Sequence, residues 1–182
     1  MEKANLFEKE KKMKISNKIL LLGNPVLYEV SQEVKKEKVD DLKPVVGALH
    51  EALMHFRAQY KRGRAIAAPQ IGILKRVIYM HIDKPIVLIN PQFTWKSSEF
   101  IELWDDCMSL PDLLVKVTRH KSCRLKFLDI DWQEHEWDLS GDLSELLQHE
   151  YDHLDGILST MRAVNGQAFV LSSQKEYTDF TR

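Results

Sequence analysis

The stretch that decides the interpretation of this chain is Gln148-His149-Glu150-Tyr151-Asp152-His153. It has the pattern H-E-x-x-H. On a helix, His149 and His153 lie one turn apart on the same face, so both imidazoles can reach one metal ion at about 2.0–2.1 Å. Glu150 projects beside that face and can accept a proton from water that the metal activates. The stretch therefore predicts a helix that carries a catalytic metal site.

The residues around this stretch favour a helix over about 142–154. Asp142 with Glu145 three residues later resembles an N-terminal capping box, and Gly156 ends the helix. The alternative is an ordinary helix in which two histidines occur by chance and bind nothing. An apolar stripe would anchor the helix in the core, and it consists of Leu143, Leu147, Tyr151, Leu154 and Leu158.

Two histidines do not complete a catalytic site, which needs a third protein ligand and one open position. After His153 the sequence contains no further histidine, and the only glutamate is Glu176 near the end of the chain. Upstream, Cys107 follows a predicted strand in the segment 105–111, and a thiolate there would complete the ligand set. Taken alone, either Cys107 or Cys123 is an ordinary small buried side chain. The two-histidine helix favours the ligand interpretation for Cys107 only.

A third segment rich in small residues is Gly63-Arg64-Ala65-Ile66-Ala67-Ala68-Pro69-Gln70-Ile71-Gly72. It has too few glycines for a phosphate-binding loop, but its small residues let another backbone approach closely. The amide of Gln70 can donate a hydrogen bond to an oxyanion. Taken alone, this segment predicts a tight loop.

Composition sets the broad class of protein. The chain has 182 residues and a net charge of −1, which argues against binding through nucleic-acid phosphates. Two cysteines cannot build a disulfide-rich secreted scaffold. The apolar run Ile19–Leu22 is far too short for a signal peptide or a membrane span. We therefore expect residues 1–17 to be an N-terminal extension, residues 18–182 to form one domain, and the protein to be cytoplasmic without membrane contact.

The order of predicted elements gives an α+β fold with a mostly antiparallel sheet. A first helix is expected from about residue 40 to residue 60, followed by strands and then by the helix over 142–154. The strands are expected at Lys75–Ile82, Ile86–Asn90, Glu99–Trp104, Val115–Asp129 and Glu134–Leu139.

The three segments together resemble the peptide deformylase family. That family shows G-x-G-x-A-A-x-Q, E-G-C-x-S and Q-H-E-x-D-H in this order. Here they stand as residues 63–70, 105–109 and 148–153, and Ile19–Leu27 also resembles the family's start. The resemblance runs from about residue 18 to about residue 158. It implies mostly antiparallel sheets around a central metal-binding helix.

The resemblance also implies a role for individual residues. It makes Glu150 the general base that later protonates the leaving amine, with Gln70 and the backbone N–H of Met108 as donors to the oxyanion. The implied metal is Fe²⁺, with Zn²⁺, Ni²⁺ or Co²⁺ able to occupy the site. Its implied ligands are Cys107, His149 and His153, and the residues expected to contact the substrate are Ala65, Ile66 and Asp106.

The implied reaction is hydrolysis of the N-formyl group from the N-terminal methionine of a nascent peptide, at the ribosome, which releases formate. Three positions depart from the family pattern. Ala65 replaces the second glycine of the first motif, Asp106 replaces the glycine before the cysteine, and Asp105 is a shortened glutamate. Together with Asp142, these carboxylates are expected near the substrate pocket. Two alternatives stay open: an amidohydrolase for another acyl group, and a non-catalytic peptide-binding relative.

Overall fold

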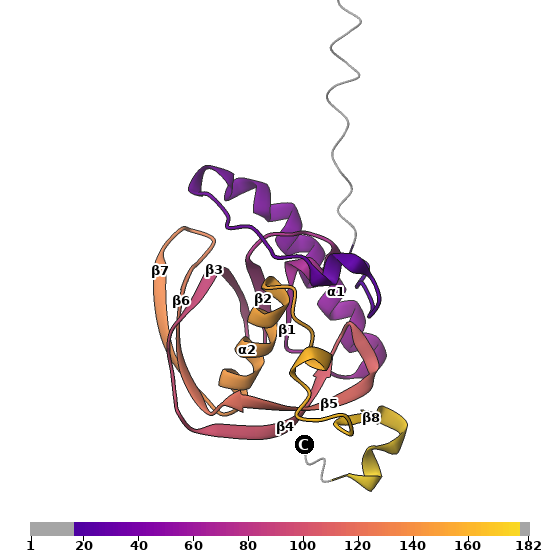
Figure 1. Ribbon diagram of the computed structural model, residues 1–182. Helices are drawn as coiled ribbons and strands as arrows, with labels where there is room; N and C mark the ends of the chain where they lie inside the picture. Colours follow the sequence, from indigo (N-terminus) through magenta and orange to yellow (C-terminus); the bar gives the residue numbers. More distant parts are fainter. Residues whose placement is uncertain (1–16, 179–182) are drawn as a thin grey trace, which may run out of the picture.

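The computed structural model describes residues 17–178, and in it two antiparallel sheets enclose one helix (Figure 1). The larger sheet has the strand order β1-β2-β3-β6-β7 and the smaller sheet has the order β4-β5-β8. The strands are β1 Ala65–Ala67, β2 Val77–His81, β3 Pro85–Lys96, β4 Phe100–Cys107, β5 Leu110–His120, β6 Ser122–Leu128, β7 Glu134–Ser140 and β8 Phe169–Leu171. The mixed α+β class with antiparallel sheets is thus confirmed.

Helix α2, Asp142–Leu154, lies between the two sheets (Figure 1). From Ser144 to Glu150 every residue is buried, including charged ones. Its apolar residues Leu146, Leu147 and Leu154 pack against Leu88, Leu125 and other strand residues in one hydrophobic cluster. Because residues 144–150 present no solvated face, their polar side chains need partners inside the protein. Leu143, which the sequence places in the core stripe, is 38% exposed.

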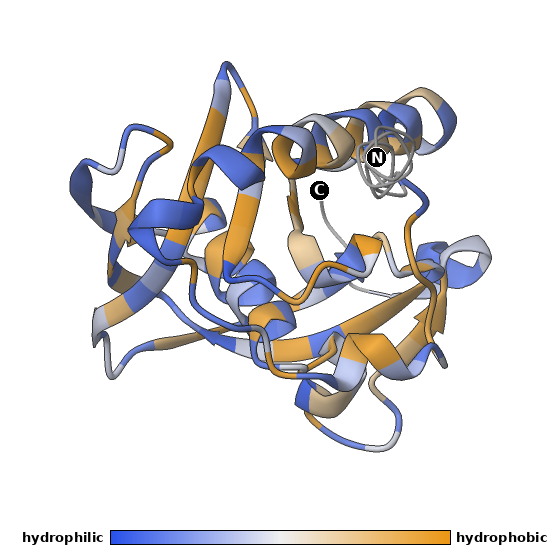
Figure 2. Cartoon of the chain, turned by 90° about the horizontal axis from the view of Figure 1, so that it is seen from above, coloured by the Kyte–Doolittle hydropathy of each residue, from blue (hydrophilic) through white to orange (hydrophobic). Residues whose placement is uncertain are grey.

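Helix α1, Lys43–Tyr60, covers the other side of the larger sheet. Figure 2 shows hydrophilic and hydrophobic residues alternating along it, as expected for an amphipathic helix at the surface. Leu49, Leu53 and Phe56 face a cluster that also contains residues of β1 and β2. The helix ends where Lys61 takes a left-handed conformation with φ 58°.

The structure corrects three local predictions. The expected strand Val115–Asp129 is two strands, because the chain turns at Lys121 and passes from the smaller sheet to the larger one. The expected loop over residues 63–72 contains the short strand β1 and a 3₁₀ turn, Ala68–Ile71. The expected capping box is wrong, because Gly141 is the N-cap and the side chain of Glu145 pairs with Arg64 instead.

The predicted N-terminal extension falls almost entirely outside the described residues. Of the predicted extension 1–17, residues 1–16 lie outside the described part, and Asn17 donates a hydrogen bond to Glu51. The division into an extension and one domain therefore stays a prediction. No helix within residues 17–178 is both long and apolar enough to span a membrane.

Candidate metal centre

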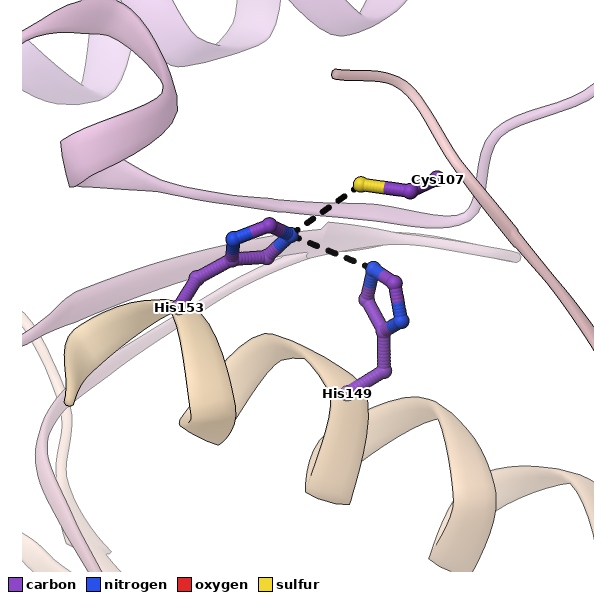
Figure 3. A group of neighbouring side chains, drawn as sticks. All are labelled: Cys107, His149 and His153. Carbon is purple, nitrogen blue, oxygen red and sulfur yellow. Dashed lines mark hydrogen bonds between the residues drawn. The ribbon is translucent and has the colours of Figure 1, made fainter. Parts of the chain in front are cut away.

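Three side chains from two elements converge beside α2 (Figure 3). Cys107 ends β4, and His149 and His153 lie one turn apart on α2. The Nε2 atom of His153 lies 3.2 Å from the Sγ atom of Cys107 and 3.2 Å from the Nε2 atom of His149. All three ligand atoms lie within 4.8 Å of one another, and all three residues are buried. The structure thus brings together the three residues that the sequence nominates as metal ligands.

The donor atoms fit a divalent transition metal. Two imidazole nitrogens and one thiolate suit Zn²⁺ or Fe²⁺ rather than the oxygen-seeking Mg²⁺ or Ca²⁺. The Nδ1 atom of His149 lies 2.9 Å from both carboxylate oxygens of Asp105, which orients its Nε2 atom toward the other two donors. Two imidazole nitrogens and a sulfur packed this closely repel one another unless a proton or cation lies among them. These observations support a metal site with three protein ligands.

Asp105 belongs to a buried network of charges behind the candidate metal centre. Arg119 of β5 donates one hydrogen bond to Asp105, at 2.9 Å, and another to Asp152 of α2. Arg162 donates to the same Asp152 carboxylate at 2.8 Å. Burial by itself would raise the pKa of Asp105, but His149 and Arg119 outweigh it and hold the pKa well below its usual range. Asp105 is therefore a permanent anion that fixes the ring of His149.

The two histidines have opposite electrostatic environments. Burial lowers the pKa of His153, and the positive charge of the neighbouring His149 lowers it further, so His153 is neutral. Burial also opposes charge on His149, but Asp105 and Cys107 overcome it and raise the pKa of His149. A neutral His153 offers the nitrogen lone pair that a metal needs, and a metal that binds His149 displaces the proton from its Nε2 atom.

Glu150 is buried next to these ligands and lines an open cleft. Burial raises its pKa to about 7, with Asp105 and Glu145 also raising it and His149 and Arg64 opposing. Its Oε2 atom has no hydrogen-bond partner among residues 17–178. A buried carboxylate oxygen without a partner is costly, and a water molecule or substrate in the cleft would relieve it.

Gln70 faces the same centre from the 3₁₀ turn after β1. Its Oε1 atom accepts a hydrogen bond of 2.9 Å from the N–H of Ala67, which settles the orientation of the amide. The Nε2 atom then points to Ser109, at 3.2 Å from its Oγ atom, and to the Sγ atom of Cys107 at 3.8 Å. An amide group held in this way is a preorganised donor beside the candidate metal centre.

The cleft has a volume of about 460 Å³ and runs from the candidate metal centre to the end of α1. Ala65 and Asp106 line it, and Met108 contributes a side chain that also packs against the core. The side chain of Ile66 is fully buried in that core, so only its backbone is left to meet a substrate. The residues that line the cleft are Phe56, Arg57, Lys61, Arg62, Gly63, Arg64, Ala65, Gln70, Asp106, Met108, His149 and Glu150.

The expectation that three carboxylates surround this cleft holds for only one of them. Asp106 lines the cleft and lies 3.5 Å from Arg62. Asp105 lies behind the candidate ligands in the charge network. Asp142 is exposed and lines a separate hollow with Leu143.

Two features of the site escaped the sequence reasoning. One is the network centred on Arg119. The sequence did contain a clue to it, because Arg119 follows Val117 by two residues and therefore lies on the same buried face of β5. A buried arginine at such a position requires a carboxylate partner. The other is the ion pair between Arg64 and Glu145, which joins the cleft wall to α2 and which no local pattern indicates.

Comparison with known proteins decides the family. The model of the polypeptide deformylase family matches residues 16–168. The chain belongs to the polypeptide deformylase family. It is 32% identical over 171 residues to a peptide deformylase of Pseudothermotoga lettingae, with 90% of this chain and 96% of the relative covered. Enzymes of this family are metal-dependent hydrolases that remove the N-formyl group from nascent peptides.

Solved deformylases have the same fold. The crystal structure of peptide deformylase from Thermotoga maritima has a TM-score of 0.75 and 29% identity, covering 82% of this chain and 99% of its own. A deformylase of Synechococcus elongatus in complex with actinonin has a TM-score of 0.76 and 26% identity, with coverage of 95% and 91%. A class I type b deformylase of Acinetobacter baumannii, bound to Met-Ala-Ser, has a TM-score of 0.73 and 27% identity, with coverage of 82% and 99%.

Proposed function

We propose that this chain hydrolyses the N-formyl group of formyl-methionyl peptides at the centre formed by Cys107, His149 and His153. These three residues hold a divalent metal, Fe²⁺ in the native enzyme, with Zn²⁺, Ni²⁺ or Co²⁺ as substitutes. The observation that carries the proposal is the convergence of the three ligand atoms within 4.8 Å, beside a buried carboxylate at the inner end of a cleft. The metal, when bound, supplies Lewis acidity that activates water and polarises the formyl carbonyl.

The remaining chemistry belongs to side chains of this protein. Glu150 takes a proton from the attacking water as the water oxygen bonds to the formyl carbon. The same carboxyl group then gives a proton to the amine nitrogen as the carbon–nitrogen bond breaks, which leaves formate and a free N-terminal methionine. The bond cleaved is an amide bond other than a peptide bond. Gln70 Nε2 and the N–H of Met108 donate hydrogen bonds to the carbonyl oxygen as negative charge develops on it.

Substrate binding in this proposal involves the edge of the larger sheet. Strand β1 is the outermost strand of that sheet, and Ala65 lines the cleft. An extended peptide laid along this edge finds backbone partners in β1 and places its first residue next to the candidate ligands. The Met-Ala-Ser peptide bound to the Acinetobacter baumannii deformylase supports a substrate of this class.

The proposal includes a cytoplasmic location and a nascent chain at the ribosome as the source of the substrate.

The decisive experiment measures formate release from a formyl-Met peptide by protein loaded with Fe²⁺ or Co²⁺ under anaerobic conditions. Acetyl-Met peptide is the control substrate. Glu150→Gln should lower kcat by about 10²–10⁴-fold, because it removes the proton acceptor without changing the shape of the side chain. Its metal content should equal that of the unaltered protein. Release of acetate at a similar rate, or full activity of the variant, would contradict the proposal.

A further inference from the structure

The outer part of the cleft is lined by positive charge. Four cationic side chains line it, and they come from the end of α1 and the segment that leads into β1. They are Arg57, Lys61, Arg62 and Arg64. Among the described residues 17–178, only two carboxylates line the same cleft, Asp106 and the deeply buried Glu150. The charge balance of the whole chain, −1, gives no hint of this local excess.

The partners of these cations show which of them are neutralised. Arg64 pairs with Glu145, and Arg62 faces Asp106 at 3.5 Å while also donating to the carbonyl of Pro111. Arg57 donates to the carbonyl oxygens of Gly63 and His81.

Lys61 Nζ donates to the carbonyl oxygen of Ala58 at 2.9 Å. Among residues 17–178, neither Arg57 nor Lys61 has a carboxylate partner. Both side chains lie at the negative end of the α1 dipole, which partly offsets their charge. The ammonium group of Lys61 has three N–H donors and uses one of them here, so two can reach a substrate. The outer cleft therefore keeps an excess of about two positive charges.

The direction of the substrate follows from burial. His149, Glu150 and Gln70 are at most 6% exposed and form the inner end of the cleft, whereas Lys61 is exposed and Arg62 is half-buried. A peptide whose formyl group reaches the inner end must leave past these cations. Because an extended chain advances about 3.3 Å per residue, the residues that follow methionine are the first to meet them.

We propose that the cleft selects formyl-methionyl peptides that carry an aspartate or glutamate immediately after the methionine. Lys61 is the specificity-determining residue, and Arg57 adds to the positive field. This inference rests on the proposed function and adds a substrate class to it. A neutral residue at that position of the peptide loses the attraction to the cations of the outer cleft, and a lysine there is repelled by them.

The test compares kcat/KM for three peptide amides, formyl-Met-Asp-Val, formyl-Met-Asn-Val and formyl-Met-Lys-Val. The amide end removes the terminal carboxylate, and a fourth peptide with a free C-terminus measures the effect of that group separately. We expect the aspartyl peptide to exceed the asparaginyl peptide by about fivefold at low salt, because each partly exposed ion pair contributes modestly. The ratio should shrink as NaCl rises from about 50 to about 500 mM.

Charge variants assign the effect to residues. Lys61→Gln should lower the ratio of kcat/KM for the aspartyl peptide to kcat/KM for the asparaginyl peptide. Lys61→Glu should reverse the preference, so that the lysyl peptide has the highest kcat/KM. Lys36→Gln is the matched control, because Lys36 is an exposed lysine that does not line the cleft, and the ratio should stay unchanged. Binding of the products Met-Asp-Val amide and Met-Asn-Val amide, measured by calorimetry, gives the same comparison without turnover.

The outcomes separate the two claims. Formate release from all three peptides at equal kcat/KM overturns the acidic preference and leaves the deformylase proposal intact. Formate release from none of them overturns the proposed function, and the product-binding ratio then decides the acidic preference by itself. A ratio that persists in Lys61→Gln and Lys61→Glu overturns the assignment to Lys61.

Discussion

At the scale of single residues, Asp105 links the candidate metal centre to the rest of the core. Its carboxylate receives a hydrogen bond from Arg119 and holds the Nδ1 atom of His149. A partner of this kind sets the tautomer and orientation of a metal-binding imidazole. Asp105 is therefore a positioning residue, which acts through His149 and does not itself touch the substrate.

We expect Asp105→Asn to weaken metal affinity by about 10–100-fold and to lower the free energy of unfolding by about 3 kcal/mol. The stability loss arises because Arg119 stays buried with one carboxylate fewer. Metal competition against a fluorescent chelator measures the first effect and urea unfolding the second. Asp105→Glu keeps the charge and should recover metal affinity. Stability loss with unchanged metal affinity in Asp105→Asn would show a purely structural role.

At the scale of elements, α2 shows most clearly what sequence can predict. The bounds expected for it, about 142–154, agree with the structure, because an H-E-x-x-H stretch between polar and glycine boundaries is a strong local signal. Its cap was not predictable in the same way. The carboxylate of Glu145 does not cap the helix, because it pairs with Arg64, which is 81 residues distant in the chain. Cys107 was nominated because two histidines leave a ligand set incomplete, and the family resemblance supported it. No local pattern relates β4 to α2, so the sequence alone could not place the three residues together.

The strands show the opposite limit. Buried side chains recur at odd-numbered positions both before and after the turn at Lys121, which is itself exposed, so periodicity alone joins β5 and β6 into one strand. Strand β1 has three residues, two of them alanines, which are depleted in strands, so a single isoleucine between them gives little strand signal. It exists because Ala65–Ala67 pair with residues 78–80 of β2. Such pairing is tertiary information that a single sequence does not reveal.

The end of α2 leads to a prediction about two glycines. Gly156 has φ +71°, and a Cβ atom there would lie 2.4 Å from the carbonyl oxygen of Tyr28. Gly156→Ala should therefore lower the free energy of unfolding by about 2 kcal/mol or more, through both strain and the clash with backbone. Gly47→Ala is the matched control, because Gly47 lies within α1 with nothing near its Cβ position.

The control variant should raise the free energy of unfolding by about 0.5–1 kcal/mol, since alanine is the better helix former. Thermal and urea unfolding of both variants check the pair of values. Equal stability of Gly156→Ala and the unaltered protein would mean that the segment after α2 rearranges away from Tyr28.

At the scale of the whole molecule, the candidate metal centre joins the smaller sheet to α2, which the buried Arg119 network also connects. Cys107 belongs to the smaller sheet, and His149 and His153 belong to the helix that packs under the larger one. A metal bound by all three therefore connects the two layers. Because the unfolded chain lacks this arrangement, metal binding adds to the stability of the entire fold.

We therefore expect a chelator to abolish formate release and to lower the melting temperature together. A metal present at 100 times its dissociation constant stabilises a folded protein by about 2.7 kcal/mol, which corresponds to roughly 5–10 °C for a chain of this size. Circular dichroism melts before chelation, after chelation and after addition of Fe²⁺, Co²⁺, Ni²⁺ or Zn²⁺ measure the shift. Glu150→Gln should keep the full shift, since Glu150 is not a ligand in this proposal, and Cys107→Ser should lose most of it. A shift in melting temperature that survives in Cys107→Ser would show that the metal binds elsewhere. A melting temperature that changes with neither chelator nor metal would show that packing and the Arg119 network alone hold the two layers together.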